Sequence, residues 1–303
     1  MSGPTGPTDG LVVVDKPPGL TSHDVVGRIR RLAHTRRVGH AGTLDPMATG
    51  VLVVAVGRAT RLLTHLLLAE KTYIATIRLG QATSTDDAEG EPTGGHDPSG
   101  LTTEAIDRAL ARFTGSIEQV PSRYSAVKIG GRRAYELARA GEDVELTARA
   151  VTVNVFERRS APRPEAGWLD LEVLVECSSG TYIRALARDV GAALGVGAHL
   201  TSLRRLRVGP FRIEQAHTLD QLAELRDPVT LPLAAALPVA MPVRTLSDDE
   251  VREVGFGRPV AVYSGGGPGK STWGGIAADG RAVAVLRDEG ERARPVVVFA
   301  PAN

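Results

Sequence analysis

The sequence is poor in cysteine and in aromatic residues. It has one cysteine, Cys177, and an aromatic content of 4% over 303 residues. A single cysteine excludes an internal disulfide framework and is typical of a reducing compartment, so we expect a cytoplasmic protein. The seven histidines and the cysteine show no metal-ligand spacing, and we therefore expect no bound metal.

Long hydrophobic runs are also missing, so no membrane span is predicted. Residues 1–10 are small, polar and proline-bearing, without the basic and apolar regions of a signal peptide. We predict that they form a disordered tail. An apolar content of 42% is ordinary for a folded protein. The length suits one large domain and one small domain.

Net charge is only +1, but the charges are segregated along the chain. Residues 28–37 and 199–212 carry several arginines and no acid, whereas residues 79–107 carry seven acids and no Lys or Arg. Basic segments of this kind suit a phosphate-binding face, since phosphate neutralisation supplies much of nucleic-acid affinity. Solvated helix faces are an equal alternative. The acidic residues 81–100 are predicted to be a loop that does not contact RNA.

Hydrophobic periodicity predicts both strands and helices along the chain. Strands are expected at residues 11–15, 51–56, 71–79, 151–157 and 168–177, with a basic strand or turn at 200–208. Helices are expected to begin at Thr21 or Ser22, at Thr102 or Thr103, and near Tyr182. The proline-rich residues 228–242 are predicted to be a connector. Short strands at 260–263, 273–277, 282–286 and 296–299 predict a small C-terminal β-barrel.

Residues 38–57 are the most informative stretch. Glycine and threonine dominate its first half, which predicts an irregular loop, and the run 51–56 predicts a buried strand. Asp45 therefore lies in a glycine-bounded loop that leads into the core, and Pro46 restricts its backbone. An Asx turn would explain an isolated Asp-Pro, but this loop also contains His40 and is flanked by arginines.

Residues 115–150 interleave basic and aromatic side chains. This composition suits a mobile flap that binds a nucleic-acid strand. A helical hairpin with snorkelling arginines is an alternative of equal weight.

Six ordered blocks resemble the TruB family of tRNA pseudouridine-55 synthases. They extend over about residues 11–210 and are Asp15–Gly19, His40–Gly50, Lys71–Tyr73 with Leu79–Gly80, Tyr124–Lys128, Gly180–Arg184 and Leu203–Leu206. The resemblance implies an α/β (α+β) pseudouridine synthase fold at 11–240, with a mixed sheet, a central RNA-binding cleft and a thumb-like flap at about 115–150. It also implies a PUA-like domain at 243–303.

The same resemblance implies that the protein isomerises uridine 55 in the TΨC loop of tRNA, without a cofactor. Asp45 would be the catalytic group that helps break the N-glycosidic bond, Tyr73 would stack on the flipped base and Arg184 would pair with Asp45. His40 would fill the gap left by that base, and Tyr182 would line the pocket. The remaining implied residues, which support or bind the substrate, are Lys16, Lys71, Gly42 and Leu203.

Independently of the resemblance, the residue types suit this chemistry. A base in a folded loop must be flipped out into a pocket and held against an aromatic side chain before it can react. Two other functions remain open. One is a guide-RNA-dependent synthase that acts within a ribonucleoprotein, and the other is an RNA chaperone without necessary chemistry. The long segment 115–150 and the short C-terminal region favour a stand-alone enzyme that binds tRNA as a monomer with no obligatory protein partner.

Overall fold

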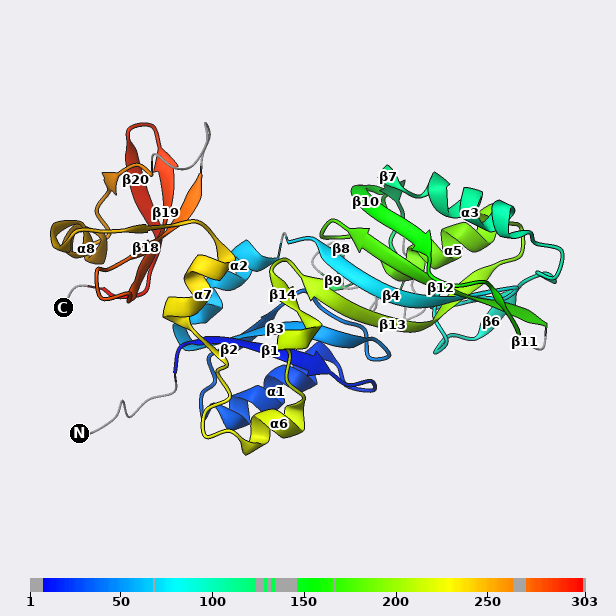
Figure 1. Ribbon diagram of the computed structural model, residues 1–303, viewed down its shortest axis with the longest axis horizontal. Coiled ribbons are helices and arrows are strands. Elements are labelled where there is room, and N and C mark those ends of the chain that lie inside the picture. The colour runs from blue at the N-terminus through cyan, green and yellow to red at the C-terminus, as the bar shows by residue number, and fades with distance from the viewer. Residues whose placement is uncertain are drawn as a thin grey trace.

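The computed structural model describes residues 8–67, 69–123, 128–129, 132–133, 146–165, 167–263 and 271–301. One large mixed sheet crosses the molecule, and a smaller sheet lies at one end (Figure 1). The large sheet has 11 strands. They are β1 (Gly10–Lys16), β2 (Val38–Ala41), β3 (Thr49–Val56), β4 (Lys71–Leu79), β7 (Gly115–Gln119), β10 (Arg149–Arg158), β11 (Arg163–Glu165), β12 (Trp168–Cys177), β13 (Ala198–Val208), β14 (Phe211–Arg212) and β15 (Leu231–Pro232).

The strand order is β15-β1-β3-β13-β4-β12-β10-β7, with β2 paired to β3, β11 to β12 and β14 to β13. Two short hairpins stand apart from this sheet: β5 (Ala82–Thr83) with β6 (Pro92–Gly94), and β8 (Lys128–Ile129) with β9 (Arg132–Arg133). Strands β1, β3 and β2 form one end of the sheet, and β4, β12, β10 and β7 form the other. Strand β13 joins the two groups.

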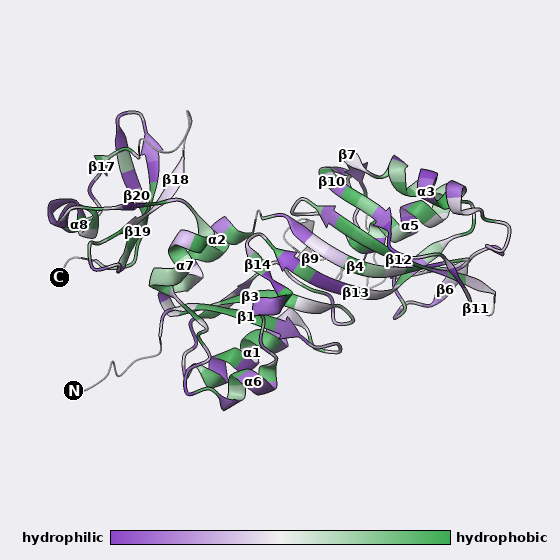
Figure 2. Ribbon diagram, in the orientation of Figure 1, coloured by the Kyte–Doolittle hydropathy of each residue, from purple (hydrophilic) through white to green (hydrophobic). Residues whose placement is uncertain are grey.

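The helices bury apolar stripes against the sheet. They are α1 (Ser22–Leu32), η1 (Gly57–Leu62), α2 (Leu63–Leu66), α3 (Thr103–Arg112), α5 (Ile183–Ala193), η2 (Ile213–Gln215), α6 (Leu219–Glu224) and α7 (Leu233–Ala240). Thr21 caps α1 with a capping box that includes Asp24, and Thr102 caps α3, as predicted. Figure 2 shows the hydrophobic residues concentrated along the strands and on one side of each longer helix.

Strands β1 and β3 are apolar along nearly their whole length because both of their faces are covered. On β1, Val12 and Val14 pack in the cluster that contains α1, α3, α5 and α6, whereas Leu11 and Val13 pack in the cluster that contains η1, α2 and α7. Neighbouring residues of a strand point to opposite faces. A strand covered on both faces therefore reads as a continuous hydrophobic run.

A separate five-stranded sheet forms the C-terminal β domain, with the curvature of a half-barrel. Its strands are β16 (Val243–Thr245), β17 (Val260–Ala261), β18 (Thr272–Ile276), β19 (Ala282–Glu289) and β20 (Arg292–Val298), and α8 (Asp248–Gly255) packs on it. Helices α2 and α7 lie between this sheet and the large one (Figure 1). Arg58 and Arg61 of η1 donate hydrogen bonds to the carbonyl oxygens of Phe299 and Val298, so β20 is tied to the end of β3.

Two predicted loops contain regular structure. Residues 38–41, expected to be irregular, form β2 and pair antiparallel with β3. The expected connector at 228–242 contains β15 and the helix α7, although Pro238 lies within that helix. Leu233 and Leu237 of α7 are buried between the two sheets, and this burial outweighs the local cost of the proline.

The junction between the two halves of the large sheet depends on Gly50. Arg205 of β13 pairs with Gly50 of β3 on one side and with Tyr73 of β4 on the other. Gly50 has φ +98°, and a Cβ there would lie 2.2 Å from the carbonyl oxygen of Arg205. Only glycine can therefore hold this backbone conformation at this separation.

We expect Gly50→Ala to destabilise the fold by about 3 kcal/mol or more, because backbone strain and a backbone clash act together. Urea unfolding at equilibrium would measure the loss. Gly115→Ala is the matched control, since Gly115 has φ +93° but a Cβ there would meet nothing within 4 Å. That variant should lose only about 1 kcal/mol. Equal losses in the two variants would contradict this account of the junction.

Candidate active site

Asp45 lies in the loop between β2 and β3, and the surrounding backbone is held by two side chains. Ser22 Oγ, at the start of α1, accepts a hydrogen bond from the backbone N–H of Leu44 at 2.9 Å. The Lys16 ammonium donates to the carbonyl oxygens of Pro17, Leu20 and Pro46 at 2.9, 2.6 and 3.1 Å. These bonds fix the loop on both sides of Asp45. The Asp45 side chain itself keeps 34% of its surface exposed.

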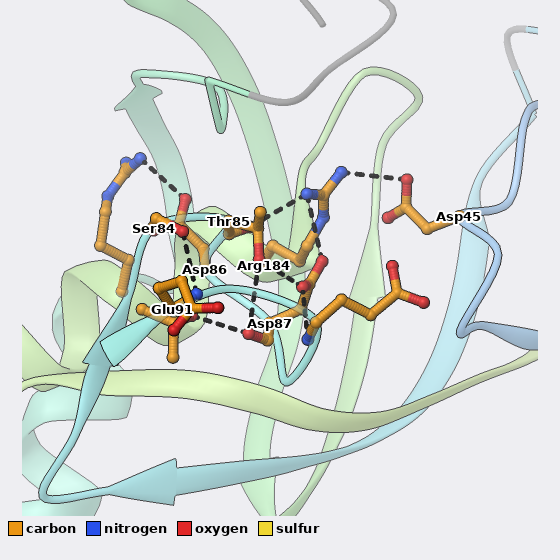
Figure 3. A network of polar contacts seen from close by, with 10 residues as sticks. Asp45, Ser84, Thr85, Asp86, Asp87, Glu91 and Arg184 are labelled. Carbon is orange, nitrogen blue, oxygen red and sulfur yellow. Dashed lines mark hydrogen bonds and ion pairs between the residues drawn. The ribbon is translucent and has the colours of Figure 1, made fainter. Parts of the chain in front are cut away.

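Arg184 connects Asp45 to a second carboxylate (Figure 3). It lies in the first turn of α5, and its side chain is only 5% exposed. One nitrogen is 3.0 Å from Asp45 and another is 3.3 Å from Asp87, whose side chain is 4% exposed. Arg184 also donates to the carbonyl oxygen of Thr85 at 3.0 Å. The guanidinium is thus fixed from one side while it presents a hydrogen bond to Asp45.

Asp87 was not predicted to belong to the site. It comes from residues 81–100, which the sequence presents as an acidic loop. In the structure this segment folds back so that its acids meet the arginines of α5, with Asp86 also 3.4 Å from Arg188. Asp87 is held by the hydroxyl of Thr85 and the backbone N–H of Glu89. The adjacent acids in a turn-rich stretch were the one available signal, and nothing in the sequence pairs them with Arg184.

A cavity of about 230 Å³ opens beside Asp45. The predicted residues that line it are Gly42, Asp45, Lys71, Tyr73, Tyr182, Arg184 and Leu203. Tyr73 is 6% exposed, and burial raises the pKa of its hydroxyl above the ordinary value of 10.0. An aromatic ring, a carboxylate and a guanidinium therefore share one small cavity with apolar walls such as Leu203 and Ile183.

Arg205 also lines this cavity and was not predicted to be a site residue. In the sequence it belongs to the basic segment 199–212 and to the block Leu203–Leu206, where no role was assigned to it. Its side chain is 1% exposed and bonds to the backbone around Asp45. By contrast, the neighbouring Arg204 points to the other face of β13 and pairs with Asp15 at 2.8 Å. Segment 199–212 is therefore not a uniform phosphate-binding face.

Lys16 and Lys71 are buried beneath the site. Burial lowers the pKa of each ammonium from the ordinary 10.5 to about 8. The Lys71 ammonium donates to the carbonyl oxygen of Ala69 at 2.7 Å, and so supports the turn that leads into β4. Both lysines therefore donate hydrogen bonds to backbone oxygens.

His40 is not among the residues that line the cavity. It lies on β2 with its ring 5.7 Å from that of His23, in an edge-to-face arrangement. Its Nδ1 is buried without a hydrogen-bond partner among the described residues, and burial lowers its pKa from 6.5 to about 4. The imidazole is therefore neutral at physiological pH. The structure does not bring His40 together with Tyr73 and Asp45 in the cavity.

The segment 28–37 presents exposed arginines around the end of α1. They are Arg28, Arg30, Arg31, Arg36 and Arg37. Half of segment 115–150 lies outside the described residues, including Tyr124, Tyr135 and Arg139. Residues 115–119 of it form β7, at an edge of the large sheet.

Among the helices that the structure describes, none is long and apolar enough to cross a bilayer.

Three family models match consecutive parts of the chain. The model described as "TruB family pseudouridylate synthase (N terminal domain)" matches residues 30–183. Those described as "tRNA pseudouridylate synthase B C-terminal domain" and "tRNA Pseudouridine synthase II, C terminal" match residues 184–232 and 241–300. Five of the six blocks quoted from the sequence lie within these matches, which extend through the C-terminal sheet, and the block Asp15–Gly19 precedes them.

Individual relatives agree over nearly the whole chain. A tRNA pseudouridine synthase B of Arthrobacter sp. (strain FB24) is 56% identical over 300 residues, covering 97% of each chain. That of Thermobifida fusca (strain YX) is 55% identical, covering 96% of this chain and 99% of the relative. Among solved structures, "Crystal Structure of a Cbf5-Nop10-Gar1 Complex" gives a TM-score of 0.72 at 29% identity, covering 96% of this chain and 85% of the other.

A second solved structure, "Structure of H/ACA RNP bound to a substrate RNA containing 2'-deoxyuridine", gives a TM-score of 0.70 at 28% identity, covering 96% of this chain and 85% of the other.

The fold, the cavity and these matches define the class of protein: the chain is a pseudouridine synthase. Within that class it belongs to the TruB family.

We expect Asp87→Asn to destabilise the protein by about 3 kcal/mol, because it removes the buried carboxylate beside Arg184 and leaves that buried guanidinium paired only with the partly exposed Asp45. Asp107→Asn is the matched control: Asp107 pairs with Arg158 at 3.1 Å, but its side chain is 49% exposed. Exposed pairs contribute at most about 1 kcal/mol. Chemical unfolding of both variants at one pH would test the contrast, and a loss in Asp87→Asn no larger than in the control would show that Asp87 does not hold Arg184.

The lysines predict a pH dependence. Between the folded pKa of Lys16, about 8, and its ordinary 10.5, the unfolded chain binds more protons than the folded chain. Stability from this group therefore rises with pH through that range. Lys16→Met removes this contribution, so the substitution should cost more stability at about pH 10 than at about pH 7. Urea unfolding at both values measures it, and a pH-independent loss would contradict the lowered pKa.

Proposed function

We propose that this protein isomerises uridine 55 in the TΨC loop of tRNA to pseudouridine, with Asp45 as the essential catalytic group. One observation carries the proposal: Asp45 is 3.0 Å from the buried Arg184 at a cavity that also contains Tyr73. The naming of relatives near 55% identity as tRNA pseudouridine synthase B supports tRNA as the substrate.

The reaction moves one bond of the base and leaves its composition unchanged. The bond from the ribose C1′ to uracil N1 breaks, the base turns, and C1′ bonds to C5. The proton on C5 is lost and N1 gains one, so atoms and electrons balance without an oxidant or reductant. We propose that Asp45 acts as the nucleophile or the acid/base group in this exchange, and that no cofactor takes part.

The cavity explains how a single base would be held. A uridine within a folded loop must leave its stack before its glycosidic bond can be approached. Tyr73 would then provide a flat surface for the flipped base, and Tyr182 and Leu203 the remaining walls. Arg184 would keep the Asp45 carboxylate directed at the sugar or base through its hydrogen bond. We assign Lys16, Lys71 and Gly42 to support of the catalytic loop.

The RNA outside the cavity would be bound through its phosphates. The exposed arginines of segment 28–37 offer several cationic groups in one region of the surface, which suits backbone contacts without sequence preference. We propose that His40, on the strand that connects this region to the Asp45 loop, contacts the RNA next to the flipped base. We also propose that residues 11–240 form the catalytic domain and residues 243–303 a PUA-like domain.

A partner-dependent synthase is the main alternative, because solved structures of assemblies resemble this chain at 28–29% identity. The relatives named for tRNA are about twice as similar in sequence. We therefore propose a cytoplasmic monomer that needs no obligatory protein partner. An RNA chaperone would not require a carboxylate held by a buried arginine, although an enzyme can also assist folding.

We expect Asp45→Asn to lose at least about 10³-fold in the rate of pseudouridine formation while it still binds tRNA, because the substitution removes the reacting carboxylate but preserves its size. The assay follows product in an unmodified tRNA transcript with purified protein and no other component. Asp97→Asn, which changes an exposed carboxylate in a loop, should retain the wild-type rate.

The outcomes separate the candidate functions. Product at uridine 55 with wild type and Asp97→Asn, but not with Asp45→Asn, would establish the stand-alone enzyme. Folded wild-type protein that binds tRNA and forms no product would overturn the proposal. A guide RNA or a chaperone activity would then be tested.

A further inference from the structure

Arg205 occupies an unusual position at the junction of the large sheet. In one row across three strands, it lies between Gly50 of β3 and Tyr73 of β4. Cross-strand neighbours in register present their side chains to the same face. The Arg205 side chain extends from this row toward the loop that contains Asp45, where it reaches the carbonyl oxygens of Val51 and Gly42.

The guanidinium holds three backbone oxygens at separate points of that loop. Its Nε donates to the carbonyl oxygen of Val51 at 2.7 Å, and one terminal nitrogen donates to that of Gly42 at 3.0 Å. The other terminal nitrogen lies 3.5 Å from the carbonyl oxygen of Thr43. The three oxygens lie before and after Asp45 in the chain, so one rigid group determines both ends of the loop.

The same guanidinium contacts the aromatic residue of the cavity. Its charge lies close enough to the Tyr73 hydroxyl to lower the pKa that burial raises. In addition, no carboxylate forms an ion pair with Arg205 among the residues that the structure describes. A buried charge is costly unless it is paired or hydrogen-bonded. The backbone oxygens of Val51, Gly42 and Thr43 therefore supply the described hydrogen bonds of this guanidinium, which couples the charge to the loop and not to a remote acid.

We propose that Arg205 is a positioning residue for the isomerisation, one that sets Asp45 and Tyr73 at their working separation in the cavity. This inference rests on the proposed function. A lysine cannot replace the arginine here, since an ammonium is a point donor and cannot direct hydrogen bonds along the fixed fork of a guanidinium. Small displacements of reacting groups carry large rate penalties, about 10²-fold for a shift near 1 Å.

The first experiment compares wild type with Arg205→Lys and Arg205→Ala in single-turnover pseudouridine formation and in equilibrium binding of the same tRNA. We expect both variants to lose about 10²-fold in rate, with the Kd for tRNA changed by no more than about twofold, because the loop geometry and not RNA affinity is altered. The rate and the Kd of each variant are measured at a temperature at which that variant is still folded.

Chemical rescue distinguishes positioning from a general loss of structure. Arg205 borders the cavity, so free guanidinium ion can reach the space left in Arg205→Ala. Guanidinium at millimolar concentration should restore part of the lost rate in Arg205→Ala, and an equal concentration of sodium ion should not. Arg205→Lys, whose side chain still fills the space, should show little rescue.

Arg204→Gln is the matched control, because it changes the adjacent residue of β13 whose side chain points to the opposite face. It should retain the wild-type rate. A wild-type rate in folded Arg205→Lys would overturn the inference, as would a loss that appears only in the Kd. If Arg205→Ala does not fold, the rate and the Kd of Arg205→Lys alone test the inference. Failure of wild type to form product would instead contradict the proposed function.

Discussion

The contact between β3 and β13 at Gly50 is the constraint on which the rest of the structure depends. The two halves of the large sheet come from different parts of the chain, and in the described structure β13 is the strand that joins them. The pairing between β13 and β3 is short, because in β13 only Arg204 and Arg205 pair with residues of β3. A side chain at Gly50 would separate the strands at this point. The cavity would then lose the fixed distance between the Asp45 loop and Tyr73.

Charge is distributed in the site so that one carboxylate remains available. Arg184 and the two carboxylates it touches carry a net single negative charge. Asp87 is buried and surrounded by hydrogen-bond donors, so it serves to orient the guanidinium. Asp45 is one-third exposed and faces the cavity. The same ion-pair chemistry therefore gives one acid a structural role and leaves the other accessible to a substrate.

Much of this arrangement could be read from the sequence, where local signals were strong. Capping residues placed the starts of α1 and α3, and the apolar run at 51–56 placed β3. Asp45, Tyr73, Tyr182 and Arg184 were found through their resemblance to a family and do meet at one cavity. Their roles in catalysis stay predictions that the proposed variants test.

Asp87 and Arg205 were not predicted as site residues for one physical reason: the residues they contact are far away in the sequence. Asp87 lies 97 positions from Arg184 in the sequence, so no local pattern connects these two residues.

 Asp87 acquires its role only by meeting Arg184, and Arg205 only by meeting the carbonyl oxygen of Gly42, which is 163 positions away. Composition marks one as part of an acidic loop and the other as part of a basic strand. In the same way, the burial of α7 between two sheets is invisible in a proline-rich segment.

The hydrogen bonds between η1 and the end of β20 have a consequence for how an RNA would fit the protein. Arg58 and Arg61 follow β3 directly and bond to the end of the C-terminal sheet. The catalytic loop precedes the same strand. The C-terminal sheet is therefore connected to the catalytic loop through one buried strand, without a flexible linker between them. An RNA that contacted both would have to span a fixed distance, so its length and shape would matter as well as its bases.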